Sequence, residues 1–152
     1  MEKIRNFIIK VISTFFFFGF FPYTPATFTS SICLFFVWLL RDLLFIYSLA
    51  TLLIIILGFI TTTHAELLFN KKDSQHIVID EAAGIFLSFL FVPLNFKSIL
   101  LGFFLFRALD ALKVFPASIY EKFRGAKGIM LDDMVAGIYT NLILQFAFRF
   151  LA

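Results

Sequence analysis

The sequence has little charge, few histidines and almost no cysteine. Charged residues make up 15% of its 152 positions, whereas a soluble domain carries about a quarter. Its single cysteine, Cys33, excludes a disulfide framework and a cysteine-based zinc site. Its two histidines, His64 and His76, lie far apart in the sequence, so neither a histidine metal site nor a Ser-His-Asp arrangement is indicated.

Apolar residues are abundant instead, and they occur in long runs. They make up 61% of the chain, and the mean hydropathy is +0.98. The runs cover residues 7–21, 28–40, 43–60, 77–92, 98–112 and 134–151. None alternates with period two, and an open sheet cannot expose its edges to lipid. We therefore predict an all-α, polytopic membrane bundle of about five to six helices. It forms one membrane-embedded domain over residues 1–152, although only the run 43–60 approaches the roughly 20 residues of an isolated span.

The charges that remain are unevenly placed. The net charge is +3, and the basic residues flank apolar runs, which suits anionic lipid and membrane topology better than nucleic acid. With the N-terminus in the cytoplasm, residues 61–83 and 107–133 are cytoplasmic. Ten of the thirteen Lys and Arg residues and nine of the ten carboxylates then lie at this face. The positive-inside rule explains the bases but not the acids. We therefore expect a central acidic site facing the cytoplasm.

Two of the polar segments precede apolar runs. Residues 25–30 read Pro-Ala-Thr-Phe-Thr-Ser, where Thr27 either caps a helix or helps its free amides to bind phosphate. Asp80 and Glu81 are adjacent acids with apolar residues on both sides. They are either capping acids or ligands of a shared cation, because desolvated carboxylates are costly without one. Carboxylate oxygens are hard ligands that suit Mg²⁺.

Two further polar segments lie in the second half of the chain. Arg107, Asp110 and Lys113 are spaced three apart, so we expect them on one side of a helix. They form either a structural ion-pair ladder or a metal-binding Asp between two cations that hold phosphate oxygens. A glycine-containing loop then leads to a second acidic pair, Asp132 and Asp133. Two acidic pairs plus Asp110 at one face exceed what helix capping explains.

At these four segments the sequence resembles the phosphatidylglycerophosphatase A family. The family motif Ile-Val-x-Asp-Glu-x-x-Gly is matched by residues 77–84, and Asp73 corresponds to the Asp that lies just upstream of this motif in the family. The motif Gly-Ile-Met-x-Asp-Asp-x-Val-Ala-Gly is matched by residues 128–137. The motif Phe-Arg-x-x-Asp-x-x-Lys-Pro-x-Pro is matched at Phe106, Arg107, Asp110, Lys113 and Pro116, with Val114 replacing a proline. The motif Pro-Gly-Thr-x-Gly-Ser resembles residues 25–30, where Ala26 and Thr29 replace its two glycines.

The resemblance implies a Mg²⁺-dependent phosphatase of the bacterial cytoplasmic (inner) membrane. Such an enzyme converts phosphatidylglycerophosphate to phosphatidylglycerol and phosphate. The implied catalytic residues are Asp80, Glu81, Asp110, Asp132 and Asp133. The implied metal ligands are Asp80, Glu81, Asp110 and Asp133, and the implied phosphate-binding residues are Arg107, Lys113, Thr27 and Ser30. The expected partners are the phospholipid substrate and the membrane, with no nucleic acid, and the sequence leaves the oligomeric state open.

Two other functions compete with this interpretation. The first is another lipid-phosphate enzyme, but acid phosphatase-like lipid phosphatases need an Arg and catalytic His set that is lacking here. The aspartate spacing of the CDP-alcohol phosphotransferases is also absent. The second is a non-enzymatic, ion-coupled transporter that uses intramembrane carboxylates. Acids dispersed at mid-span would favour a transporter, whereas these acids lie at the ends of apolar runs.

Overall fold

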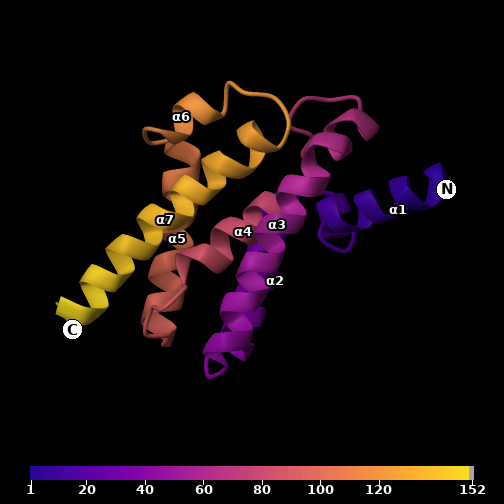
Figure 1. Ribbon diagram of the computed structural model, residues 1–152. Coiled ribbons are helices and arrows are strands. Elements are labelled where there is room, and N and C mark those ends of the chain that lie inside the picture. The colour runs from indigo at the N-terminus through magenta and orange to yellow at the C-terminus, as the bar shows by residue number, and fades with distance from the viewer. Residues whose placement is uncertain (151–152) are drawn as a thin grey trace.

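The computed structural model describes residues 1–150, and within them the chain is helical (Figure 1). The helices are α1 (Glu2–Ser13), α2 (Pro25–Leu39), α3 (Leu44–Leu68), α4 (Ile79–Ser88), α5 (Phe96–Leu112), α6 (Ala117–Tyr120) and α7 (Ala126–Phe150), with a short 3-10 helix η1 (Phe18–Phe20). No strand occurs in this part of the chain, which confirms the all-α prediction. The described residues form seven α-helices, one more than the upper expectation, because the four-residue α6 was not predicted. Leu151, the predicted end of the last apolar run, lies outside the described residues.

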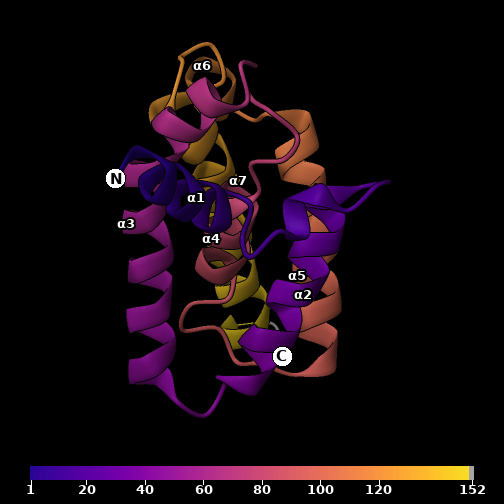
Figure 2. The same cartoon turned by 90° about the vertical axis from the view of Figure 1, so that its right-hand side faces the viewer.

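The short helix α4 occupies the centre of the bundle. It contacts α2, α3, α5 and α7, and in Figure 2 it lies with α7 between α3 and the pair α2 and α5. Every residue of α4 from Ile79 to Phe86 is buried. Ten residues give a helix of about 15 Å, half of the roughly 30 Å hydrocarbon core. The apolar run 77–92 therefore forms a buried half-length helix and does not by itself cross a membrane.

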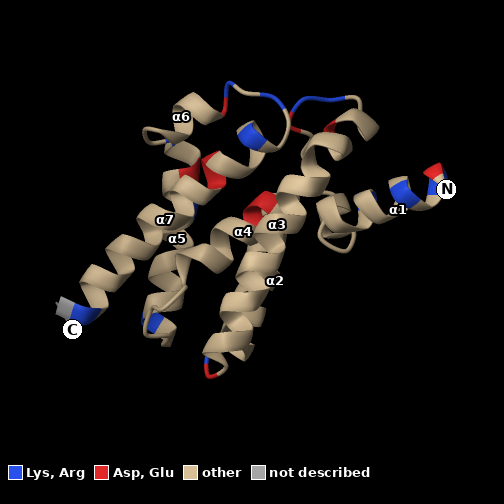
Figure 3. Cartoon of the chain, viewed as in Figure 1, with Lys and Arg blue, Asp and Glu red and all other residues tan. Residues whose placement is uncertain are grey.

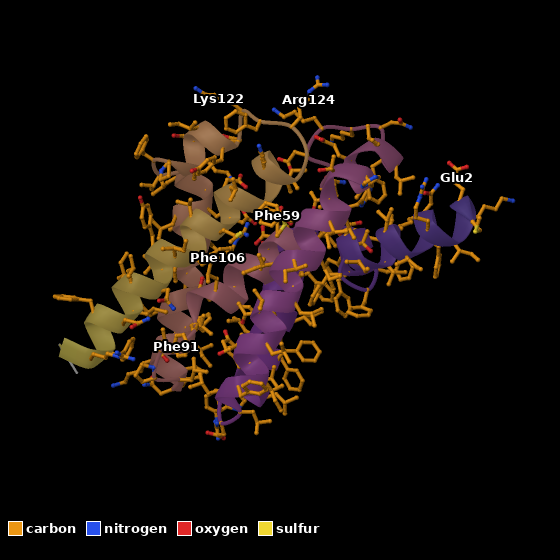
Figure 4. All side chains as sticks on the ribbon, viewed as in Figure 1. Glu2, Phe59, Phe91, Phe106, Lys122 and Arg124 are labelled. Atoms are coloured by element: carbon orange, nitrogen blue, oxygen red, sulfur yellow. The ribbon has the colours of Figure 1, made fainter. Side chains whose placement is uncertain are left out.

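The crossing of α4 and α7 depends on two glycines. A Cβ on Gly137 would lie 2.6 Å from the carbonyl oxygen of Gly84, and one on Gly84 would lie 3.0 Å from the carbonyl oxygen of Asp133. A Cβ on Gly84 would also lie 2.6 Å from the ring of Phe106, a fully buried residue in the middle of the bundle (Figure 4). Because neither glycine has a side chain, the two helix backbones touch. This contact brings the two acidic pairs close together.

The N-terminal apolar run does not form one helix. Helix α1 ends at Ser13, and the Thr14 hydroxyl donates to the Lys10 carbonyl at 2.7 Å and accepts from the Phe17 amide at 3.1 Å. The next residues, 15–17, all have positive φ angles, between 45° and 68°. This left-handed turn reverses the chain before η1, so α1 extends sideways from the rest of the bundle (Figure 1).

The exterior of the bundle is strongly apolar. Within the described residues, α3 is the one helix that is both long and apolar enough to cross a membrane; its 25 residues span about 37 Å. Large apolar side chains are exposed on most of the helices, for example Phe35 on α2, Phe45 on α3, Phe104 on α5 and Leu142 on α7. Soluble monomers rarely expose large contiguous apolar patches, so this surface is compatible with lipid contact around several helices.

The connections between helices alternate between two ends of the molecule. The α3–α4 and α5–α6–α7 connections share one end, and the α2–α3 and α4–α5 connections lie at the other (Figure 1). Figure 3 shows the acidic residues of α4, α5 and α7 in the same half of the molecule as the charged connections. Arg41 and Asp42 belong to the α2–α3 connection, Lys97 to the first turn of α5 and Arg149 to the last turn of α7. These segments lie at the end of the bundle opposite to the α3–α4 and α5–α6–α7 connections (Figure 1).

Candidate active site

The helices surround a polar cavity of about 370 Å³. It lies between the starts of α2 and α4, the end of α5, and Asp132 and Asp133, which lie about two turns into α7. Eight of the nine predicted site residues line this cavity: Thr27, Asp80, Glu81, Arg107, Asp110, Lys113, Asp132 and Asp133. Ser30 is the exception. The four polar segments, which span more than a hundred residues of sequence, thus converge on one cavity.

The first acidic pair lies in the first turn of α4. Asp80 and Glu81 are both buried, at 8% and 6% exposure. Glu81 accepts hydrogen bonds from Arg107 Nη1, which lies 2.7 Å from each carboxylate oxygen. The Oδ1 atom of Asp80 is buried and has no hydrogen-bond partner among the described residues. An unpaired buried acceptor is costly, and the nearby positive end of the α4 dipole offsets only part of that cost.

Two residues of the predicted ladder, Arg107 and Asp110, lie on α5, whereas the third, Lys113, follows the end of the helix. Arg107 and Asp110 lie one turn apart on α5, with Arg107 Nη1 3.4 Å from Asp110 Oδ2. Lys113 lies just beyond the helix with a left-handed φ of 46°, which costs a non-glycine residue roughly 1–2 kcal/mol. Its Nζ donates to Asp110 Oδ1 at 2.8 Å and to Asp132 Oδ2 at 2.7 Å, two contacts that hold this conformation in place.

The two cations therefore link different helices. Arg107 joins α5 to Glu81 of α4, and Lys113 joins the end of α5 to Asp132 of α7. Lys113 Nζ also lies 3.8 Å from Asp133 Oδ1. Since these ion pairs cross between helices, the residues form a connected cluster and not a ladder along one helix.

The cluster has an excess of negative charge. Six carboxylates, Asp73 among them, and two cations line the cavity, so its formal charge is −4 if all of them are ionised. Burial, then the charge of Glu81, raises the pKa of both Asp80 and Asp133 well above the ordinary value. Burial also raises the pKa of Asp132 to about 6, against the opposing effect of Lys113. Like charges held this closely favour either proton uptake or binding of a cation.

The donor chemistry of the cavity fits Mg²⁺. Its acidic side chains offer only hard oxygen ligands, and the buried Oδ1 atom of Asp80 has a free coordination position. Among the described residues, however, no three carboxylate, imidazole or thiol groups converge as a finished ligand set. Arg107 and Lys113 hold the carboxylates instead. A metal ion would need these carboxylates to turn from the cations toward a common centre.

The two hydroxyl residues of the first polar segment occupy different places. Thr27 lines the cavity, but it does not cap α2, which begins at Pro25 with Thr24 in the N-cap position and no side-chain cap. The capping interpretation of Thr27 was wrong because Pro25 takes the first helical position, where its missing N–H does no harm. Ser30 is fully buried, and its hydroxyl donates to Glu81 Oε2 at 2.9 Å. In this structure Ser30 orients a carboxylate and does not reach the cavity.

Several residues that line the cavity were not among the predicted site residues. Asp73, Ser74 and Gln75, from the connection before α4, and Thr24 also line the cavity. Asp73 was matched to the family motif but was not assigned a role, although its charge contributes to the raised pKa of Asp80. Its position in the motif was the available signal, whereas Thr24 carries no comparable signal.

Comparison with known proteins shows the family to which this chain belongs. A family model described as phosphatidylglycerophosphatase A matches residues 11–148. The chain belongs to the phosphatidylglycerophosphatase A family. Because the family's phosphatidylglycerophosphatases are phosphoric monoester hydrolases, the chain is an enzyme of that class.

Individual relatives agree with this membership. Phosphatidylglycerophosphatase A of Escherichia coli (strain K12) is 32% identical over 131 residues, covering 84% of this chain and 76% of the relative. Its counterpart in Haemophilus influenzae is 36% identical over 107 residues, covering 69% and 65%. A Bacteroides thetaiotaomicron protein with the provisional name phosphatidylinositol-3-phosphatase is 29% identical over 154 residues, covering 95% and 96%. No solved structure matches the chain.

Proposed function

We propose that this member of the phosphatidylglycerophosphatase A family is a Mg²⁺-dependent lipid phosphatase. It hydrolyses phosphatidylglycerophosphate to phosphatidylglycerol and phosphate at the cytoplasmic face of the inner membrane. The observation that carries the proposal is the convergence of the five predicted catalytic carboxylates, Arg107 and Lys113 on one cavity. Two relatives that bear the name of this activity support the substrate.

The cations are the groups suited to bind the phosphoryl oxygens. Arg107 offers a planar fork of donors and Lys113 a compact point charge, and both reach the cavity from the end of α5. A phosphomonoester would replace the carboxylate oxygens that these side chains now contact. Both would then neutralise charge that develops on the phosphoryl oxygens in the transition state. Thr27, at the cavity wall, is the remaining candidate phosphate-binding residue.

The carboxylates released in this exchange would hold the metal ion. We assign Asp80, Glu81, Asp110 and Asp133 to it, as the family resemblance implies. Three of them now contact the cations, and Asp80 has an unpaired oxygen. When bound, Mg²⁺ supplies positive charge to the phosphoryl group and to the attacking oxygen. One of the five carboxylates then acts as nucleophile or accepts the proton of the attacking water.

The apolar exterior indicates how a lipid would reach this cavity. We propose that α3 and further helices with exposed apolar side chains cross the membrane, with residues 61–83 and 107–133 on the cytoplasmic side. The acyl chains then remain in lipid while the headgroup enters the cavity. To test the orientation, the buried Cys33 is replaced by Ala and single cysteines are introduced at positions 42, 73 and 124. Labelling at both from the cytoplasm and at position 42 from the periplasm is expected, and periplasmic labelling at 73 or 124 would overturn the proposed orientation.

The activity is tested by phosphate release from phosphatidylglycerophosphate in detergent, first with Mg²⁺ and then with EDTA. Release only with Mg²⁺ is the expected result, and its absence would remove the proposed function. Phosphatidylinositol 3-phosphate serves as a second substrate, because the relative that aligns with 95% of the chain bears the corresponding provisional name. Faster hydrolysis of that lipid would change the assigned headgroup but not the phosphomonoester chemistry.

A further inference from the structure

A second cavity, of about 460 Å³, lies where α3 ends and α7 begins. It shares no lining residue with the acidic cavity. Its charged lining residues are Lys71, Lys72, Arg124 and Glu66, so its formal charge is +2. Among the described residues, none of the three basic side chains forms an ion pair with a carboxylate. Lys72 Nζ has only a carbonyl acceptor, that of Glu121 at 3.3 Å.

The acidic side chain that lines this cavity, Glu66, accepts hydrogen bonds from two backbone amides. Glu66 Oε2 accepts from the Gly125 amide at 2.8 Å, and Oε1 accepts from the Asp73 amide at 3.2 Å. Thr63 Oγ1 accepts from the Ala126 amide at 3.0 Å. These amides at the start of α7 are therefore already bonded to α3. The three basic side chains remain as the groups that a ligand could bind.

The same contacts hold the basic residues around one space. Glu66 joins the end of α3 both to the connection that carries Lys71 and Lys72 and to the connection that carries Arg124. Gly125 has a φ of 67°, and a Cβ there would lie 2.8 Å from Thr63 Oγ1, so its backbone passes directly against α3. Arg124 and Lys122 lie at the end of the molecule far from Phe91 (Figure 4).

We propose that this cavity is a second anion site, which binds a phosphate group through Lys71, Lys72 and Arg124. Three cations held around one space repel one another, and a phosphate would neutralise them with an Arg fork and two Lys point charges. The cavity also lies at the end of α3, the candidate membrane span, where basic pockets meet lipid headgroups. The phosphate is therefore that of an anionic phospholipid headgroup or a free phosphate ion.

The test measures binding by thermal stability and does not depend on turnover. The full chain is placed in nanodiscs of phosphatidylcholine alone, of phosphatidylcholine with phosphatidylglycerol, or of phosphatidylcholine with inorganic phosphate in the buffer. EDTA is present throughout, so that no metal links phosphate to the acidic cavity. A ligand that binds only the folded state raises the melting temperature, and we expect a rise of about 3–6 °C with a bound anion.

The triple variant Lys71→Gln, Lys72→Gln, Arg124→Gln should lose most of this rise. The matched control Lys3→Gln, Lys122→Gln, Lys127→Gln removes the same charge from exposed residues that do not line the cavity, and it should keep the rise. Arg124→Gln alone should reduce the rise in melting temperature. This single variant replaces the triple variant in the test if the triple variant does not fold. Arg124→Lys retains the charge and should preserve more of it.

The outcomes separate the sources of the phosphate. A rise only with phosphatidylglycerol identifies a lipid headgroup, and a rise with inorganic phosphate identifies a free ion. If neither anion stabilises the wild-type chain, the proposal is wrong. It is equally wrong if the cavity variants keep the full rise, or if the control loses as much as the triple variant. Because no arm uses substrate hydrolysis, these results stand apart from the test of the proposed phosphatase activity.

Discussion

Two arginine–carboxylate pairs lie at opposite ends of this molecule, and they differ in almost everything but composition. Arg41 and Asp42 are neighbours in the α2–α3 turn, with Nε 3.2 Å from Oδ2, and the Asp42 side chain is 83% exposed. Arg107 contacts Glu81 at 2.7 Å from another helix, and the Glu81 side chain is 8% exposed. The first pair is solvated and contributes little to stability, whereas the second has been removed from water at a substantial cost.

The difference teaches which charges are candidates for chemistry. The pair in the turn involves one connection of the chain, and its arginine also stacks on Trp38, 4.0 Å from the ring centre. The buried pair belongs to a cluster drawn from α4, α5 and α7, with a hydroxyl from α2. Assembling like charges in a buried cavity is unfavourable unless a ligand shares them, so convergence and burial together mark the functional end.

The sharpest way to break this comparison is to remove a single carboxylate from each end. Asp80→Asn or Asp133→Asn should lower the rate of phosphate release by about 10³-fold or more, because each removes a proposed metal ligand from the cavity. Asp42→Asn should leave the rate within about twofold, because that side chain is exposed at the other end. Melting temperatures in EDTA serve as the control for folding. They should be unchanged or higher in the cavity variants, because one buried like charge has been removed. Near-wild-type rates for both cavity variants would contradict the assignment.

The two arginines provide the next comparison. Arg107→Lys keeps the charge but loses the planar guanidinium, whose Nη1 atom contacts both oxygens of Glu81 and whose other donors are available to a phosphoryl group. We expect a loss of about 10²-fold in kcat. The same substitution at Arg41 should change kcat little. Steady-state kinetics on both variants measures this difference. Equal effects at the two positions would show that the buried pair has only a structural role.

A smaller effect is expected from the hydroxyls that neighbour each other on α2. Ser30→Ala removes the hydrogen bond to Glu81, worth about 1 kcal/mol, and should lower kcat by about fivefold. Ser31, which is exposed and donates to the Thr27 carbonyl, is the matched control, and Ser31→Ala should be nearly silent. A pH–rate profile distinguishes positioning from simple loss of packing, because a misplaced Glu81 should shift the profile.

The smallest effect concerns stability as a function of pH without metal. An unfolded Asp titrates near 3.9, whereas the pKa of folded Asp132 is about 6. Between these values the folded state binds more protons than the unfolded state, so stability in EDTA should fall as pH rises from about 4 to about 6. Thermal unfolding across that range measures the slope. Asp132→Asn should flatten it and Asp42→Asn should not, and Mg²⁺ should stabilise the chain more at pH 7.5 than at pH 5 because protons and metal compete.

Local sequence features predicted the helices well where apolar runs were long and uninterrupted. The runs 28–40 and 98–112 correspond to α2 and α5, and the run 43–60 became the longer α3. The run 7–21 was less predictable, because the Thr14 hydroxyl and three left-handed residues end α1 at Ser13. Those contacts carry no periodic signal in an apolar stretch. The short length of α4 could not be predicted from its apolar run either, because these residues are buried among neighbouring helices and not exposed to lipid.

By itself, the sequence determined the helical class of this protein and the residue types of its site, because apolar runs and the polar residues between them act locally. It also identified the family motifs. Only the tertiary structure decided that Ser30 donates a hydrogen bond to Glu81, 51 residues away, and that Lys113 joins Asp110 to Asp132. The physical reason is the contact between α4 and α7 at Gly84 and Gly137, which sets the distance between the two acidic pairs. Spacing along the chain holds no information about that distance.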